Sequence, residues 1–240
     1  MALFGAPESR PDDTQRAVRC AIAMQRALRD LNQGDSFGLE QPLQMGIAVH
    51  CGEVVLGNIG SEQRLKYGVV GDAVNVTGRI EALTIGKQVL ISAAAYDGVC
   101  DELEVGDPRE FDVKGGSEPL IVYEVHGMNE LFDALSMPTP HEAPMRKVQR
   151  AGELFRFENK AVVDAAVPVE VMRIGRDGAV LVSAVALALR GDIKLRVERD
   201  DGTWEEELYG KVISELGEHL ADGSVRYRVA FTGRTRPADD

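Results

Sequence analysis

Apolar residues at the start of the chain follow first a helical and then a strand-like pattern. A polar start at residues 11–14 precedes apolar residues at every third or fourth position as far as Gln33, which predicts a helix. The residues of this predicted apolar face are Ala17, Cys20, Ala21, Met24, Leu28 and Leu31. Residues 43–49 and 53–56 then predict two adjacent strands joined by a tight connection.

Short strands and helices alternate up to about residue 125. Strands are predicted at 67–70, 89–91, 109–114 and 120–125. Asp72 is the predicted N-cap of a helix after the first of these, and Ser92 caps a short helix that extends to Val99. The candidate buried residues of the first helix are Val74, Val76 and Ile80. The last two strands form a predicted β-hairpin across Gly115 and Gly116.

The composition changes near Gly127, and three prolines fall between residues 137 and 144. Clustered prolines are typical of a linker or an extended connector. The strands predicted beyond it are 167–174, 179–182, 192–198, 207–214 and 225–231. Their regular spacing favours a small antiparallel β-barrel. The predicted organisation is two domains, 1–126 and 146–240, joined by a proline-rich linker at 127–145.

The segments that indicate chemistry lie between residues 45 and 81. Asn75 and Arg79 are four residues apart on one predicted helix, so their side chains lie on the same face. Arginine suits phosphoryl charge because its guanidinium donors form a fixed planar fork. Taken alone, the pair also fits an exposed helix face with surface partners, so both interpretations stay open at this point.

Together, residues 45–55, 57–62 and 67–81 resemble class III nucleotide cyclases, whose signature reads GI..H.GEVV.GNIGS and then Y.V.GD.VN...R.E. Residues 1–7 resemble the family segment after its second metal aspartate, and residues 113–115 resemble its late VKG turn. The resemblance implies an α+β fold with a ferredoxin-like core, here partial. It also implies function as a homodimer, or as a heterodimer with a complete cyclase.

The resemblance further implies a reaction and a site. In the family, the 3′-hydroxyl of ATP or GTP attacks the α-phosphate and pyrophosphate leaves, with Mg²⁺ or Mn²⁺ as cofactor. By resemblance, Asn75 orients the ribose and Arg79 stabilises charge on the transferring phosphoryl group, which makes both candidate catalytic residues. The candidate nucleotide-binding residues are Gln63 and Gly68, at the base-reading positions, and Lys114, near the phosphates. Because Gly68 has no side chain, the choice between ATP and GTP stays open.

The chain departs from the family pattern at the metal site. Both family aspartates lie upstream of a segment like residues 1–5, so no metal ligand is assigned in this chain. Asp12 and Asp13 are interpreted as N-terminal caps and partners of the helix dipole. The first strand and helices of the core are expected to be missing, which leaves a sheet edge uncovered. We therefore expect the isolated chain to produce no cyclic nucleotide.

Residues 146–240 weakly resemble a PilZ-like β-barrel. PilZ domains that bind cyclic di-GMP carry an RxxxR motif followed by DxSxxG. Arg146 and Arg150 fit the first motif, whereas residues 173–178 keep only Gly178 of the second. A solvated linker with basic residues is the favoured interpretation of the RxxxR match in a chain with 27 lysines and arginines. This domain is interpreted as an interaction module that has lost ligand binding.

The net charge of −12 limits the kinds of molecule that the chain is expected to bind. A chain this acidic repels phosphate backbones, which argues against nucleic-acid binding. The odd number and scattered spacing of Cys20, Cys51 and Cys100 favour reduced thiols in a cytoplasmic protein. The longest apolar run, 179–189, is shorter than the ~20 residues of a membrane span, so no membrane contact by this chain is expected.

Three functions follow from these observations. The first is a cyclase-family signalling module that is active only when other residues supply the metal aspartates. The second is a non-enzymatic pseudo-cyclase that dimerises with active cyclases and uses its barrel for protein contacts. The third is a cyclic di-GMP receptor. The missing aspartates argue against the first, the retained Asn75 and Arg79 against the second, and the absent DxSxxG against the third.

Overall fold

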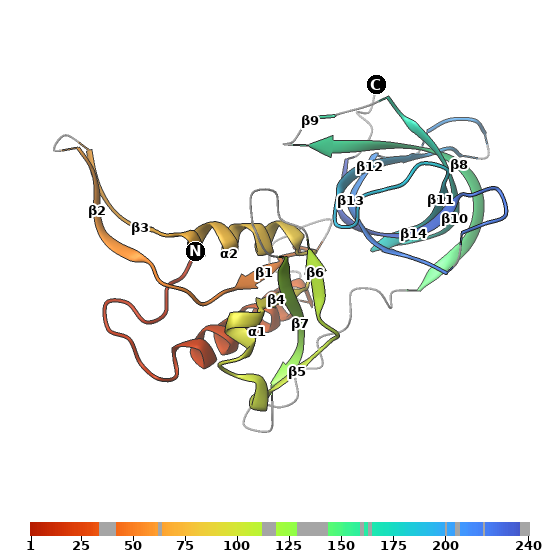
Figure 1. The fold of residues 1–240 in the computed structure, drawn as a ribbon. Helices are drawn as coiled ribbons and strands as arrows, with labels where there is room; N and C mark the ends of the chain where they lie inside the picture. Colours follow the sequence, from red (N-terminus) through yellow and green to blue (C-terminus); the bar gives the residue numbers. More distant parts are fainter. Residues whose placement is uncertain are drawn as a thin grey trace. The chain divides into compact units, whose positions relative to one another are not determined.

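The computed structural model describes residues 1–33, 42–61, 64–111, 119–128, 144–158, 161–162, 165–199, 201–204, 207–217 and 219–235. Internal contacts divide the chain into two compact units, Met1–Thr139 and Pro140–Asp240 (Figure 1). The first unit combines helices with a mixed sheet, and the second is built from antiparallel strands. A mixed α/β unit followed by a barrel agrees with the coarse fold class predicted from the sequence.

The sheet of the first unit has the strand order β1-β4-β7-β5, and β6 also pairs with β7. Its strands are β1 (Ile47–Val49), β4 (Val89–Ser92), β5 (Leu103–Val105), β6 (Arg109–Phe111) and β7 (Leu120–Met128). Strands β1 and β4 run parallel, and the other pairings are antiparallel. The predicted pairing of 109–114 with 120–125 is confirmed for β6 and β7. Its turn lies outside the described residues.

The predicted pairing of 43–49 with 53–56 is wrong. Strand β1 pairs with β4, whereas β2 (Val55–Ser61) pairs with β3 (Arg64–Val70) in a separate two-stranded hairpin. The chain turns out of the sheet between β1 and β2, and the hairpin projects beyond the start of α2 (Asp72–Leu83) (Figure 1). Every residue of β4 is buried, so this strand offers β1 a partner inside the core.

Helices cover both faces of this sheet. On β4, Val89 and Ile91 join the cluster around α1 (Asp13–Gln33), and Leu90 joins the cluster around α2. Successive strand residues point to opposite faces, so the two helices lie on opposite sides. Ser92 caps α3 (Ala93–Tyr96), as predicted. The helix ends before Val99 and is followed by a 3-10 turn, Cys100–Glu102.

The predicted bounds of α1 are confirmed, but its buried face is rotated. The buried residues are Val18, Ala21, Ile22 and Gln25, whereas Met24 and Leu31 are exposed. Gln25 faces the core because its Nε2 donates to the carbonyls of Met45, at 2.7 Å, and Gln88, at 3.2 Å. A polar residue that is satisfied in this way is invisible to a count of apolar positions.

The second unit is a closed barrel. Its strands are β8 (Met145–Glu158), β9 (Ala161–Val162), β10 (Val167–Gly175), β11 (Gly178–Ser183), β12 (Asp192–Val197), β13 (Glu207–Glu215) and β14 (Val225–Thr235). The order is β10-β11-β14-β13-β12-β8-β9, and a further β10–β8 pairing closes six strands into a ring. All pairings are antiparallel, as predicted.

Alternation fills the barrel interior. Val167, Val169 and Val171 point inward from β10, and Tyr227 is fully buried with its hydroxyl accepting from the Leu187 N–H at 3.2 Å. The interpretation of Arg146 and Arg150 as part of a solvated linker is wrong, because both lie on β8. Outward-facing charges interrupt the apolar run of this strand, which hid it from the sequence analysis.

Candidate functional site

The described candidate catalytic residues lie on one side of α2. Asn75 is exposed and Arg79 is half-buried, and they are one helical turn apart. Neither side chain has a hydrogen-bond or ion-pair partner within the part of the chain that the structure describes. Without hydrogen-bond or ion-pair partners among the described residues, the polar groups of Asn75 and Arg79 are available to a ligand.

The other side of α2 anchors the helix. Ile80 is 0% exposed and packs with Leu90 of β4 and Val122 of β7. Val76, one turn earlier, is partly buried against the same cluster. The predicted burial of Ile80 is confirmed, whereas Val74 and Val76 are only partly buried. The packing of Ile80 fixes the rotation of the helix and so the direction in which Asn75 and Arg79 point.

Two glycines allow the loop after β1 to pack against the start of α2. Gly71, with φ of 156°, is the N-cap of α2, and a Cβ there would lie 2.9 Å from the carbonyl oxygen of Glu53. A Cβ at Gly52 would lie 2.7 Å from the Cβ of Ala73. The prediction of Asp72 as N-cap was wrong by one residue, because only glycine tolerates this φ and this close approach.

His50 lies beneath the same junction. Its Nδ1 is 2.8 Å from the Oγ of Ser92, and that Oγ also accepts from the Ala95 N–H at 3.2 Å. The Ser92 hydroxyl can donate to Nδ1 or accept from it, so this contact is compatible with either tautomer of His50. Burial lowers the pKa of His50, and the charge of Asp72 opposes this shift. The contact with Ser92 and the lowered pKa favour a neutral histidine that holds the loop after β1 against β4.

The candidate nucleotide-binding residues are only partly described. Gly68 lies on β3 directly opposite Gly57 of β2, so a side-chain-free pair crosses the hairpin. The structure places Gly68 on the hairpin and Asn75 and Arg79 on the helix that follows it. Gln63 and Lys114 lie outside the described residues.

Sequence reasoning missed the exposed apolar surface of this hairpin. Val55 is 69% exposed and Tyr67 is 71% exposed, and Ile59 and Val70 are also exposed. The hairpin belongs to a two-stranded sheet that pairs with no other described strand. The sequence feature that could have indicated this surface is the presence of apolar residues on both strands, next to the paired Gly57 and Gly68.

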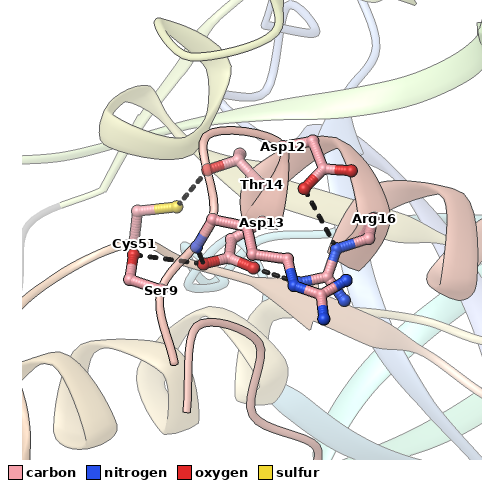
Figure 2. Close-up of polar contacts among 7 residues, drawn as sticks. Ser9, Asp12, Asp13, Thr14, Arg16 and Cys51 are labelled. Carbon is pink, nitrogen blue, oxygen red and sulfur yellow. Dashed lines mark hydrogen bonds and ion pairs between the residues drawn. The ribbon is translucent and has the colours of Figure 1, made fainter. Parts of the chain in front are cut away.

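The acidic residues at the start of α1 are engaged locally (Figure 2). Asp13 accepts from the Arg10 N–H at 2.7 Å and forms an ion pair with Arg16, which also contacts Asp12 at 3.3 Å. The Arg10 hydrogen bond, with help from Arg16, lowers the pKa of Asp13. Nearby, the Oγ1 of Thr14 lies 3.2 Å from the Sγ of Cys51. Asp13 lies in the first turn of α1, as expected for a partner of the helix dipole. In the described contacts neither carboxylate accepts from an N–H of the helix, so the predicted capping is not confirmed.

The described residues do not fit a metal centre. Within them, no three histidine, cysteine, aspartate or glutamate side chains gather closely enough to hold an ion. Arg16 pairs with both Asp12 and Asp13, and its positive charge disfavours a divalent cation beside them. In the described part of the chain, no helix is both long and apolar enough to cross a membrane.

Comparison with known proteins gives consistent similarities over the first unit. A sequence model described as the adenylate and guanylate cyclase catalytic domain matches residues 1–127. Adenylate cyclase 1 of Rhizobium meliloti is 30% identical over 129 residues, which are 53% of this chain and 19% of that protein. The adenylate cyclase of Anabaena cylindrica is 38% identical over 136 residues, which are 52% of this chain and 26% of that protein.

A solved structure shows the same similarity. The guanylyl cyclase Cya2 is 48% identical, with a TM-score of 0.51, over 55% of this chain and 66% of its own chain. The chain thus spans about a quarter or less of the two curated relatives and just under two thirds of the solved one.

Proposed function

The chain belongs to the adenylate and guanylate cyclase catalytic domain family, and from this premise we propose that its first unit supplies the Asn75 and Arg79 half of a nucleotide cyclase site. The carrying observation is that both side chains lack partners among the described residues while Ile80 anchors the same helix in the core. Such a helix presents the two groups in a fixed direction.

In the proposed reaction, the 3′-hydroxyl of ATP or GTP attacks the α-phosphorus and the bond to the pyrophosphate oxygen breaks. Negative charge builds on the α-phosphoryl oxygens as this happens. Arg79 donates to those oxygens through its planar guanidinium, and Asn75 hydrogen-bonds the ribose. Mg²⁺ or Mn²⁺ neutralises phosphate charge when bound, and the described residues do not fit such an ion, so its ligands come from elsewhere. Gln63, Gly68 and Lys114 remain the proposed contacts to base and phosphate.

A second cyclase domain is the proposed source of the missing groups. The exposed Val55, Ile59, Tyr67 and Val70 lie on a hairpin outside the main sheet. An isolated two-stranded hairpin is marginally stable in water, and exposed apolar surface of this kind favours association. We infer that the hairpin contacts the partner domain, either in a homodimer or in a heterodimer with a complete cyclase.

The test is a mixed activity assay. The partner is a full-length adenylate cyclase relative in which the arginine that aligns with Arg79 is replaced by alanine. We expect the wild-type chain to restore cyclic nucleotide production with ATP or GTP and Mn²⁺. Arg79→Ala should reduce the restored rate by about 10²- to 10³-fold, as expected for loss of a transition-state charge donor, and Asn75→Ala should reduce it less.

The matched control is Arg29→Ala, which removes an exposed arginine from α1. The control should restore the rate as well as wild type does. Equal rates for Arg79→Ala and Arg29→Ala would reject the assigned role of Arg79. A chain that binds the partner and restores no activity would favour the second candidate, a regulatory pseudo-cyclase. The pairing of Asp12 and Asp13 with Arg16 supports the same candidate.

A further inference from the structure

A row of basic side chains crosses the outer face of the barrel. In the strand register, Lys147 of β8 lies opposite Arg173 of β10, Arg173 opposite Val180 of β11, and Val180 opposite Arg228 of β14. Directly opposed residues on antiparallel strands share a face. The row points outward, because the neighbours of Arg228 and Arg173 along their strands, such as Tyr227 and Ile174, are buried inside. We call Lys147, Arg173 and Arg228 the cationic row.

The cationic row is not neutralised by the barrel itself. None of its three side chains forms an ion pair within the described ranges. Glu170, on the same face of β10 and opposite Val182, pairs with none of them. The Nε of Arg228 is buried without any hydrogen-bond partner among the described residues.

Other cations of the same barrel lie near carboxylates, although the Nε of Arg196, like that of Arg228, has no hydrogen-bond partner among the described residues. Lys194 lies 3.1 Å from Glu207, and Lys211 lies 3.8 Å from Asp192. Arg196 contacts both Glu153, at 3.8 Å, and Glu207, at 3.9 Å. These cations of β12 and β13 are thus matched with carboxylates on β8, β12 and β13, whereas Lys147, Arg173 and Arg228 have no such partner among the described residues.

Two like charges directly opposite each other destabilise a sheet. Lys147 and Arg173 are such a pair, in a chain whose net charge is −12 and in which carboxylates are plentiful. Leaving them unmatched is consistent with an anion from outside the chain. We propose that the cationic row binds a phosphate-bearing small molecule, with the phosphate between Lys147 and Arg173.

The geometry favours a compact phosphate over an extended acidic peptide. Directly opposed strand residues have Cβ atoms only about 5 Å apart, so one ammonium and one guanidinium reach the oxygens of a single phosphate. Arg228 lies two strands further on, across the apolar Val180, where it reaches the remainder of the ligand. This site lies in the second unit and does not rest on the proposed cyclase function.

The experiment is calorimetric titration of the full 240-residue chain. The probes are inorganic phosphate, a nucleoside 5′-monophosphate as a monoester, a 3′,5′-cyclic nucleotide as a diester, and polyglutamate as an acidic peptide. Lys147→Gln and Arg173→Gln are compared with Arg199→Gln, which removes one exposed positive charge from a turn elsewhere in the barrel. Circular dichroism of each variant shows whether it is folded.

We expect at least one phosphate probe to bind, with affinity reduced about tenfold or more in the two row variants and unchanged in Arg199→Gln. The preferred probe distinguishes a monoester from a diester ligand. Phosphate binding that all three variants retain would place the anion elsewhere, including at α2, and would overturn the proposal. Binding of polyglutamate alone, or of no probe by the folded chain, would overturn it as well.

Discussion

The two units differ in how many sheet edges and apolar side chains their own folds leave exposed. In the first unit, the sheet ends at β1 and β5, a hairpin with exposed apolar residues stands outside it, and Asn75 and Arg79 have no partners among the described residues. In the second, the β10–β8 pairing closes the sheet on itself around a continuous core. Residues 1–139 carry 11 lysines and arginines against 21 acidic residues, and residues 140–240 carry 16 against 18.

Under the proposed function, a partner domain completes the first unit, whereas the sheet of the second unit closes on itself. A barrel leaves no open edge for another strand, so its stability depends on its own core. The hairpin of the first unit exposes apolar side chains, and a second molecule can bury them. The units also carry separate probes, because the helices of the described residues lie in the first unit and the single tryptophan, Trp204, lies in the second.

The largest expected effect is on the barrel core. Leu181→Ala removes a side chain that is 0% exposed and should lower the free energy of unfolding of the barrel by about 2–5 kcal/mol. Trp204 fluorescence during urea unfolding reads this unit, and Leu189→Ala, at an exposed position, is the control. An equal shift of the helical circular dichroism signal would show that the two units unfold together, which contradicts the comparison.

The next effect separates the two sides of α2. Ile80→Ala should destabilise the first unit by about 2–4 kcal/mol, because Ile80 packs under the helix against Leu90 and Val122. Arg79→Ala should leave stability within about 0.5 kcal/mol of wild type. Circular dichroism at 222 nm during urea unfolding measures both. A large destabilisation by Arg79→Ala would mean that Arg79 serves the fold and not a ligand.

A smaller effect is expected at the hairpin. Tyr67→Ser removes the exposed aromatic side chain of β3, and Val55→Ser removes an exposed apolar side chain of β2 that lies opposite Val70. Both should weaken association with a second cyclase domain while leaving urea unfolding unchanged. Sedimentation velocity of the chain, alone and with a relative, measures this. Association that is unaffected by both variants would place the partner contact elsewhere.

The smallest effect concerns the paired face of the barrel. The hydrogen bond from Lys194 lowers the pKa of Glu207 from its ordinary value of 4.5. A carboxylate with a depressed pKa stabilises the fold above its unfolded pKa, and this contribution is lost as the pH falls through the folded value. Glu207→Gln should therefore destabilise the barrel at pH 7 by at most about 1 kcal/mol, because the pair is partly exposed. Trp204 unfolding curves should show the difference shrinking below pH 4.5.

Local patterns predicted much of the fold. Turn residues and alternation located β10 to β14, and apolar spacing located α1 and α2. The pairing of β1 with β4 was not predictable from neighbouring segments, because forty residues separate the two strands in the sequence. Strand β8 was not predicted, because its outward-facing charged residues give it the composition of a linker. The buried face of α1 was misjudged because Gln25 is satisfied by backbone carbonyls that only the fold brings near.

For the candidate site, helical spacing placed Asn75 and Arg79 on one side of α2, and the anchoring by Ile80 shows why that side stays open. The register that aligns Lys147, Arg173 and Arg228 was hidden, because a β-bulge between Val171 and Arg173 shifts the pairing. No local pattern reveals which cations of a barrel stand opposite each other. Such juxtapositions emerge only when the strands are paired.

The most direct test of the central claim compares cyclic nucleotide production by the wild-type chain alone with production by its mixture with the arginine-deficient relative. The account predicts no product from the chain alone and a rate in the mixture that rises with chain concentration to a plateau. Product from the chain alone would contradict the account, because the chain's own residues would then supply the metal ligands.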